Sequence, residues 1–173
     1  MAHVTLLNLP ASAFIGDSHA QLVGGDVAAP HASHKARPVL SFDDTAEEAA
    51  VSPEYAMPGQ YAGGTLMATL YLYAASDAAN GCVFDVFVEA ITALDTLDLE
   101  AATGWDSANS SGDIDLSGTT AGDLVKKDIT LTNADSAAAL DLVRFGVRRD
   151  CDHANDDASG DIYVPTVEIW EST

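Results

Sequence analysis

Basic residues are scarce in this chain. Lys and Arg number 7 among 173 residues, against 27 Asp and Glu, which gives a formal net charge of −20. A surface this acidic repels phosphate groups, so nucleic acids and anionic membranes are poor partners. The charge suits a salty or divalent-rich setting, where ions screen the repulsion between carboxylates.

Cysteine is equally rare, and long apolar runs are missing. Two cysteines, Cys82 and Cys151, are too few for a disulfide framework. We expect free, buried thiols rather than a pair, because the opening residues MAHVTLLNLPASAF lack the basic n-region of a signal peptide. No segment reaches the ~18 apolar residues of a membrane span, so none is predicted.

Helical patterns of ordinary length are also missing, and alternation of apolar and polar residues takes their place. Only residues 134–140, ADSAAAL, look helix-like. A parallel βαβ architecture is therefore excluded, and the sequence predicts an all-β, antiparallel two-sheet jelly-roll β-sandwich. We expect its strands within residues 38–42, 48–57, 64–75, 82–91, 95–100, 113–118, 122–133, 141–150 and 161–170.

The first part of the chain follows a different pattern. Residues 1–36 hold four of the five histidines and show no sustained period after an opening strand-like stretch at 3–9. We expect an extended N-terminal arm or linker over 1–36 and the jelly roll over 37–173.

An acidic segment before the last strand raises the question of a metal site. An EF-hand loop starting at Asp150 would need a ligand where Ala154 lies and glycine where Asn155 lies, so the pattern fails. A looser calcium site remains an alternative to the favoured interpretation, a solvated turn with no cofactor. Its candidate ligands are Asp150, Asp152, Asp156, Asp157 and Asp161.

Two other patterns carry weak catalytic or metal signals. Ser18 within Gly-Asp-Ser, with Asp150 and His153, resembles the nucleophile, acid and base of SGNH hydrolases. Those enzymes need a parallel α/β sheet and a Gly-x-Asn-Asp block, and this chain has neither, so we predict no enzyme. His31 and His34 could share a metal, but no third ligand is evident.

Three arginines cluster near the C-terminus. If their strand neighbours residues 82–91, Asp85 and Glu89 would face Arg144 and Arg148 across the sheet. Otherwise these two, with Arg149, mark an interface with an acidic partner or another copy of the chain.

Residues 40–172 contain four distinctive features: the Phe-Asp-Asp of 42–44, the Met-Pro-x-x-Tyr-x-Gly-Gly turn of 57–64, the Leu-Asp-Leu-x-Arg-Phe strand of 140–145 and the Arg-Arg-Asp…Gly-Asp loop of 148–161. Together they resemble a β-sandwich module of tailed-phage virion proteins. The resemblance implies a decoration or cement protein that binds and stabilises the capsid surface, or a head-fibre or tail appendage. It further implies a homotrimer, the major capsid protein lattice as partner, and a location on the virion after synthesis in the host cytoplasm.

The stretch 3–9 has two alternative placements in that interpretation. It could add a strand to a neighbouring subunit through Val4, Leu6 and Leu7, because main-chain pairing demands little side-chain complementarity. Alternatively, it is an edge strand of its own domain.

A second function class stays open, a carbohydrate-binding jelly roll. Tyr71 and Tyr73 share one face of a predicted strand, and the loop that carries Trp105 could approach them to form an aromatic platform. The alternative is that both tyrosines pack under a loop or a neighbouring subunit.

Overall fold

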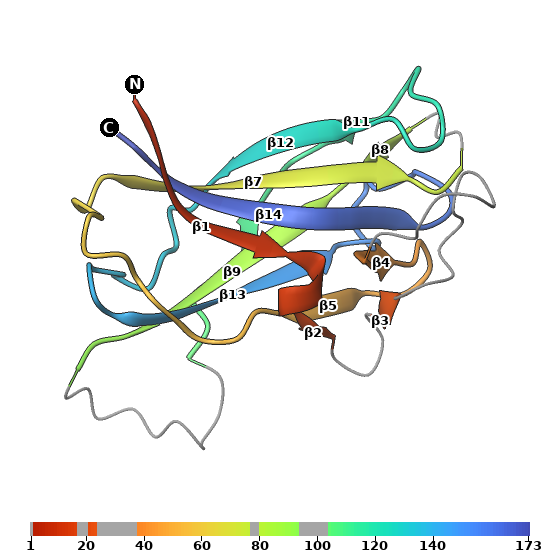
Figure 1. Ribbon diagram of the computed structural model, residues 1–173. Coiled ribbons are helices and arrows are strands. Elements are labelled where there is room, and N and C mark those ends of the chain that lie inside the picture. The colour runs from red at the N-terminus through yellow and green to blue at the C-terminus, as the bar shows by residue number, and fades with distance from the viewer. Residues whose placement is uncertain (1, 17–20, 24–37, 77–79, 94–103) are drawn as a thin grey trace.

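A computed structural model shows two antiparallel sheets packed face to face (Figure 1). It describes residues 2–16, 21–23, 38–76, 80–93 and 104–173. The predicted fold class, an all-β jelly-roll sandwich, is confirmed. The predicted strand at 95–100 lies outside the described residues. Within the described part of the chain, no helix is long and apolar enough to cross a membrane.

Sheet A is built around the last strand of the chain. Its path runs β12, β7, β14, β4 and β3, and β1 pairs with the remaining length of β14 beside β4. The strands are β1 (His3–Pro10), β3 (Gln21–Val23), β4 (Val39–Phe42), β7 (Thr65–Ala74), β12 (Val125–Thr130) and β14 (Ile162–Ser172).

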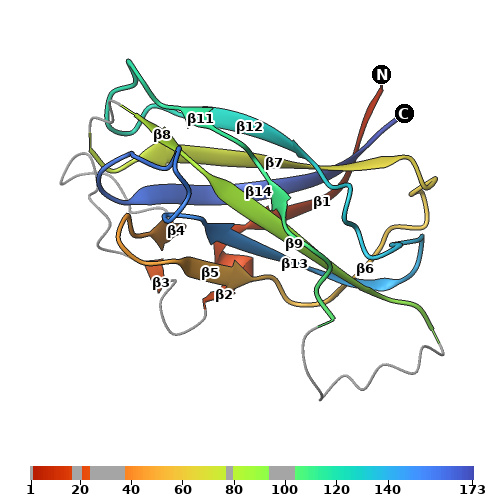
Figure 2. The same cartoon turned by 180° about the vertical axis from the view of Figure 1, so that it is seen from behind.

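Sheet B forms the opposite layer, which is seen from behind in Figure 2. Its path runs β10, β9, β13, β5 and β2, with β6 also paired to β13. These strands are β2 (Ile15–Gly16), β5 (Glu48–Val51), β6 (Tyr55–Ala56), β9 (Phe84–Ile91), β10 (Asn109–Ser110) and β13 (Leu142–Arg149). A small third sheet pairs β8 (Gly81–Cys82) with β11 (Ile114–Asp115), and η1 (Ala11–Ala13) is a single 3₁₀ turn.

The core lies between the two sheets and follows the period-2 pattern of the strands. Leu70 and Leu72 of β7 and Phe145 of β13 are fully buried. Phe42 and Phe84 join the layers by an edge-to-face contact at 5.2 Å between ring centroids. Because inward positions alternate with outward ones, each sheet keeps a second face that points away from the core.

The N-terminal strand belongs to the sandwich of its own chain. β1 pairs antiparallel with β14, and Ala2 N donates to Thr173 O at 2.8 Å, so the two termini lie side by side (Figure 1). Leu6 is buried, while Val4 and Leu7 pack against the core. Of the two placements expected for residues 3–9, the structure has the strand within its own domain. Within the expected arm of residues 1–36, the described strands β1, β2 and β3 pair with strands of the two sheets.

The helix predicted for residues 134–140 is wrong. The segment makes turns, and Asp135, Ser136 and Leu140 all have positive φ, between 50° and 72°, which is incompatible with a right-handed helix. Asp135 accepts a hydrogen bond from the Ala90 main chain at 2.8 Å, and Asp141 accepts one from Ala138 N at 2.8 Å. Hydrogen bonds accepted by the aspartate side chains, one local and one from β9, thus stabilise the turns in place of the helix that the alanines favour.

Candidate binding face

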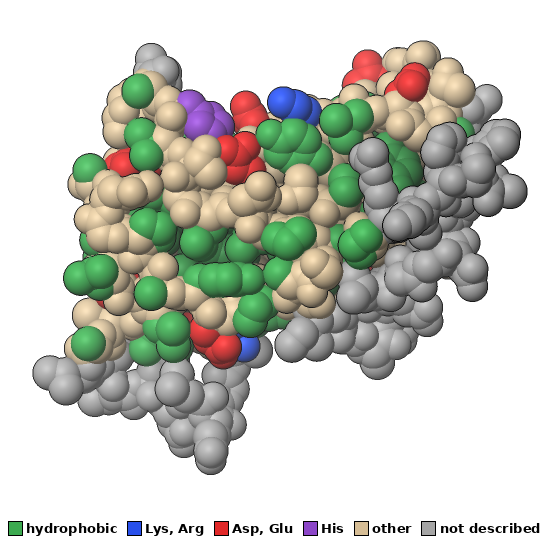
Figure 3. All heavy atoms as spheres, in the orientation of Figure 1, with side chains coloured by type: hydrophobic (Ala, Val, Ile, Leu, Met, Phe, Trp, Pro, Cys, Tyr) green, Lys and Arg blue, Asp and Glu red, His purple; other side chains and the backbone are tan. Residues whose placement is uncertain are grey.

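The outer face of sheet A, here termed face A, carries a mixed aromatic and polar surface. Its side chains alternate along β7 and β14 with the buried core residues, and its exposed members show that it is open to solvent. Figure 3 shows acidic, basic, histidine and hydrophobic groups close together along the upper edge of the molecule. The residues of face A are His3, Thr5, Thr69, Tyr71, Tyr73, Lys126, Asp128, Tyr163, Thr166, Glu168 and Trp170.

Trp170 is the largest aromatic side chain of this face, and its ring is held on two sides. The indole Nε1 donates to Thr69 Oγ1 at 2.9 Å, and that hydroxyl donates to Asp128 Oδ1 at 2.6 Å. The His3 ring stacks on the indole with centroids 4.2 Å apart and planes 11° apart. Trp170 therefore has a fixed orientation while staying partly exposed.

Glu168 is the polar centre of face A. One carboxylate oxygen accepts from Thr5 Oγ1 at 2.5 Å and lies 2.9 Å from His3 Nε2, and the other accepts from the Tyr71 hydroxyl at 3.1 Å. Burial raises the pKa of Glu168, but the hydrogen bonds from Thr5, His3 and Tyr71 outweigh it and leave the pKa below its ordinary value. The group is thus a carboxylate at neutral pH.

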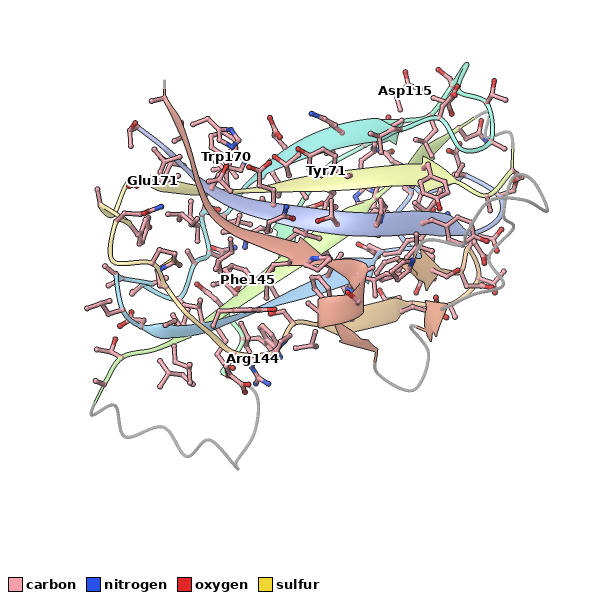
Figure 4. All side chains as sticks on the ribbon, viewed as in Figure 1. Tyr71, Asp115, Arg144, Phe145, Trp170 and Glu171 are labelled. Atoms are coloured by element: carbon pink, nitrogen blue, oxygen red, sulfur yellow. The ribbon has the colours of Figure 1, made fainter. Side chains whose placement is uncertain are left out.

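The tyrosines extend the aromatic surface toward the other end of the strands. Lys126 Nζ lies 4.8 Å above the centre of the Tyr71 ring, and Tyr73 meets Tyr163 edge to face at 5.3 Å. Figure 4 shows Tyr71 and Trp170 on the same side of sheet A, with Phe145 between the sheets and Arg144 on the far side. The prediction that Tyr71 and Tyr73 share a face is confirmed.

Two β-bulges decide which side chains reach face A. One lies in β1 between Thr5 and Leu7, and it lets Leu7 pack against the core while Thr5 points outward. The other lies in β14 between Tyr163 and Thr166 and includes Pro165, which cannot donate to a strand ladder. Together they set which side chains of β1 and β14 lie beside those of β7 and β12 on face A.

Trp105 does not join this surface, so the expectation that its loop approaches Tyr71 and Tyr73 is wrong. It covers the outer face of sheet B, here termed face B, where it meets Phe87 edge to face at 6.5 Å. Arg144 lies over its ring, with the guanidinium carbon 4.6 Å from the centroid. A Cβ added at Gly146, which lies opposite Phe87 in the ladder, would lie 3.7 Å from the nearest indole atom of Trp105, an ordinary van der Waals distance.

The arginine pairs predicted across sheet B are confirmed. Arg144 lies directly opposite Glu89 in the ladder between β13 and β9, and their side chains form a hydrogen-bonded ion pair. Arg148 lies opposite Asp85 and donates to it at 2.6 Å. The interface alternative for these two stays a prediction.

Arg149 differs from its neighbours because it is fully buried. Its guanidinium donates to Asp156 Oδ1 at 2.7 Å and to the carbonyls of Gly160 and Ala158 at 2.9 and 2.7 Å. The side chain has no exposed surface to offer a partner. It fixes the acidic connection between β13 and β14 to the core.

The acidic segment uses its carboxylates for internal contacts. Besides binding Arg149, Asp156 accepts from Val83 N at 3.0 Å, Asp157 accepts from Gly81 N at 2.9 Å, and Asp161 accepts from Ser41 Oγ at 2.9 Å. Within the described ranges, no group of three or more His, Cys, Asp or Glu side chains is placed to hold a metal ion. The favoured interpretation, a turn between strands, agrees with these contacts, while calcium binding stays a prediction.

The remaining candidates divide between described and undescribed residues. Ser18, His31 and His34 lie outside the described residues. Both cysteines are free, as expected; Cys82 is buried and Cys151 is half-buried. Burial, followed by the charge of Asp156, raises the pKa of Cys82 to about 12, which leaves the thiol protonated and unreactive at neutral pH.

Sequence reasoning missed most of face A. Thr166, Glu168 and Trp170 alternate with the apolar Val167 and Ile169, so the sequence could have predicted that all three point outward. The sequence could not predict that β14 lies between β7 and β1, the strand order that brings His3 onto Trp170.

Comparison with known proteins adds a likeness of fold. No family model matches the sequence, and no curated protein matches it. A xylan-binding CBM22-2 domain from Paenibacillus barcinonensis superposes with a TM-score of 0.48 at 12% identity, covering 96% of this chain and 99% of that one. The C-terminal CBM6 of the marine laminarinase LamC from Zobellia galactanivorans gives 0.47 at 11% identity, covering 94% and 97%.

A third match is to a longer protein. The CBM22-1 and GH10 modules of a Clostridium thermocellum xylanase, solved with xylohexaose, give a TM-score of 0.45 at 12% identity. The match covers 99% of this chain and 28% of that one, so this chain spans little more than a quarter of that structure. At these identities the likeness is one of fold, and no ligand or activity follows from it.

Proposed function

We propose that this protein is a carbohydrate-binding β-sandwich that holds its ligand on face A and performs no chemistry on it. The observation that supports the proposal most directly is the pair of oriented aromatic rings, Trp170 and Tyr71, joined through Thr69, Glu168 and their neighbours. Aromatic rings offer an apolar surface for the C–H faces of sugar rings, and the polar groups between them meet the hydroxyls.

Preorganisation strengthens the proposal. The Trp170 indole is fixed by Thr69 and by the stacked His3, and Tyr71 is fixed by Glu168. Side chains that are held before binding lose less conformational entropy when the ligand arrives. A glycan has many weak contacts and gains from such rigidity.

The capsid interpretation has no supporting observation in the described residues or in the comparisons. The homotrimer, the major capsid protein lattice and the virion location therefore stay predictions. Stoichiometric self-association of the chain and its binding to capsids would be the observations that support them.

The test is calorimetric titration of the full chain with neutral oligosaccharides: xylohexaose, cellohexaose, mannohexaose and laminarihexaose. We expect at least one to bind, and we expect Trp170→Ala and Tyr71→Ala each to weaken that binding about tenfold or more, which is ~1.4 kcal/mol. Trp105→Ala is the matched control, because it removes an equally large aromatic side chain from face B and should leave the affinity unchanged. Equal losses in Trp105→Ala and Trp170→Ala would refute face A as the site.

A further inference from the structure

The aromatic rings of face A are spread along the strands rather than gathered at one point. In the ladder between β7 and β14, Trp170 lies opposite Met67, and Tyr163 lies opposite Tyr73. Met67 and Tyr73 are six residues apart, which corresponds to about 20 Å at the rise of a β-strand. A single sugar ring cannot contact both ends of this surface, whereas an extended chain of sugars can.

The polar groups between the rings alternate in hydrogen-bonding character. Glu168 and Asp128 are acceptors, and the exposed Lys126 ammonium is a donor. A sugar hydroxyl donates and accepts at once, so a run of hydroxyls can satisfy both kinds of group. A carboxylate or sulfate on the ligand could use only the donors.

The charge of face A works against acidic ligands. Two carboxylates, Glu168 and Asp128, face one lysine, and the chain as a whole carries a formal net charge of −20. A negatively charged glycan would meet repulsion over long range and again at contact. An uncharged glycan would not be affected.

Building on the proposed function, we propose that face A selects an extended, uncharged oligosaccharide lying along β7 and β14, and that Glu168 and Asp128 are the residues that exclude acidic glycans. Glu168 also orients Tyr71 and His3, so it contributes to the shape of the site as well as its charge. Asp128 is exposed and accepts from Thr69 alone among the described contacts, which makes it the cleaner position for a charge test.

The first arm of the experiment varies ligand length. The full chain is titrated with the disaccharide, tetrasaccharide and hexasaccharide of the neutral glycan that binds. We expect the hexasaccharide to bind at least tenfold more tightly than the disaccharide. Equal affinities would overturn the extended site and leave the proposed function intact.

The second arm varies charge. Hexagalacturonate is compared with the neutral hexasaccharide at low and high salt, on the wild type and on Asp128→Asn. We expect hexagalacturonate to bind at least tenfold more weakly than the neutral ligand, with the gap narrowing in high salt and in Asp128→Asn. Asp128→Asn preserves the side-chain size but alters the site itself, so the readout is the ratio of the neutral to the hexagalacturonate affinity. A change of shape alone would weaken both ligands and leave this ratio unchanged.

The outcomes separate the two proposals. Hexagalacturonate binding as tightly as the neutral hexasaccharide, or more tightly, would overturn the exclusion of acidic glycans, while glycan binding itself would stand. Binding of no glycan in the panel would overturn the proposed function and this inference together.

Discussion

Each sheet carries one of the two tryptophans on its outer face, and the two faces use similar residues for different ends. On face B, Trp105 lies over Phe87 and Arg144, and the acids beneath, Asp85 and Glu89, are 3% exposed and paired with arginines. On face A, Trp170 stays partly exposed, and the acids bind hydroxyls instead.

The difference lies in what the carboxylates have for partners. An arginine opposite a buried acid forms strong charge-assisted hydrogen bonds and leaves little capacity for a ligand. A hydroxyl partner brings no opposite charge, and the carboxylate can still accept further hydrogen bonds from outside. Face B thus stabilises the fold, and face A is suited to bind.

The largest effect should come from breaking an ion pair on face B. Arg144→Met keeps the side-chain bulk but leaves Glu89 buried with Gly104 N as its described donor. We expect the free energy of unfolding to fall by about 3 kcal/mol, because an uncompensated buried charge is costly. Urea denaturation measures this change. A loss below about 1 kcal/mol would mean that the Arg144–Glu89 pair contributes no more to stability than an exposed ion pair does.

A smaller loss of stability should follow from removing the ring that covers face B. Trp105→Ala deletes the edge contact with Phe87 and the cation–π contact with Arg144. We expect the free energy of unfolding to drop by about 1–2 kcal/mol. If thermal and urea unfolding show no change, the contacts of Trp105 with Phe87 and Arg144 do not stabilise the fold.

The stability that Glu168 contributes on face A should depend on pH. The folded-state pKa of Glu168 lies below its ordinary value, because hydrogen bonds from Thr5, His3 and Tyr71 outweigh burial. Its stabilisation is therefore present above the unfolded-state pKa, about 4.3, and is lost as the pH falls through the folded-state pKa. The difference in unfolding free energy between wild type and Glu168→Gln should be largest near pH 7 and shrink toward about pH 3. If the difference in unfolding free energy grew as the pH fell, it would contradict a lowered pKa for Glu168 in the folded protein.

The smallest effect should come from the exposed cation on face A. Lys126→Ala removes an ammonium that lies over Tyr71 in solvent. We expect a change in unfolding free energy of about 0.5 kcal/mol, since exposed cation–π contacts are weak. A loss comparable with that of Arg144→Met would mean that face A is also primarily structural.

The sequence predicted face B better than face A for a physical reason. Alternation assigns Asp85 and Glu89 to one side of their strand and Arg144 and Arg148 to one side of theirs, so pairing follows once the strands are neighbours. The position of Trp105 could not be predicted, because it lies in a loop where no period applies.

Face A depends on contacts between distant parts of the chain. Tyr71 and Glu168 are 97 residues apart, and His3 and Glu168 are 165 apart. The bulges in β1 and β14 also shift the alternation within a strand, and periodicity alone does not locate a bulge. The fold class was predictable because it depends only on the alternation of apolar and polar residues. The set of residues on face A depends on the order of the strands, which the alternation does not give.

The two tryptophans provide the most direct test, because each reports on one outer face. Their indole N–H resonances, assigned with Trp105→Phe and Trp170→Phe, can be followed by NMR while the neutral hexasaccharides are titrated into the full chain. We predict that the Trp170 resonance shifts with saturation and that the Trp105 resonance stays in place. A saturable shift of Trp105 with Trp170 unmoved, or no shift of either with every hexasaccharide, would contradict the assignment of face A as the binding surface.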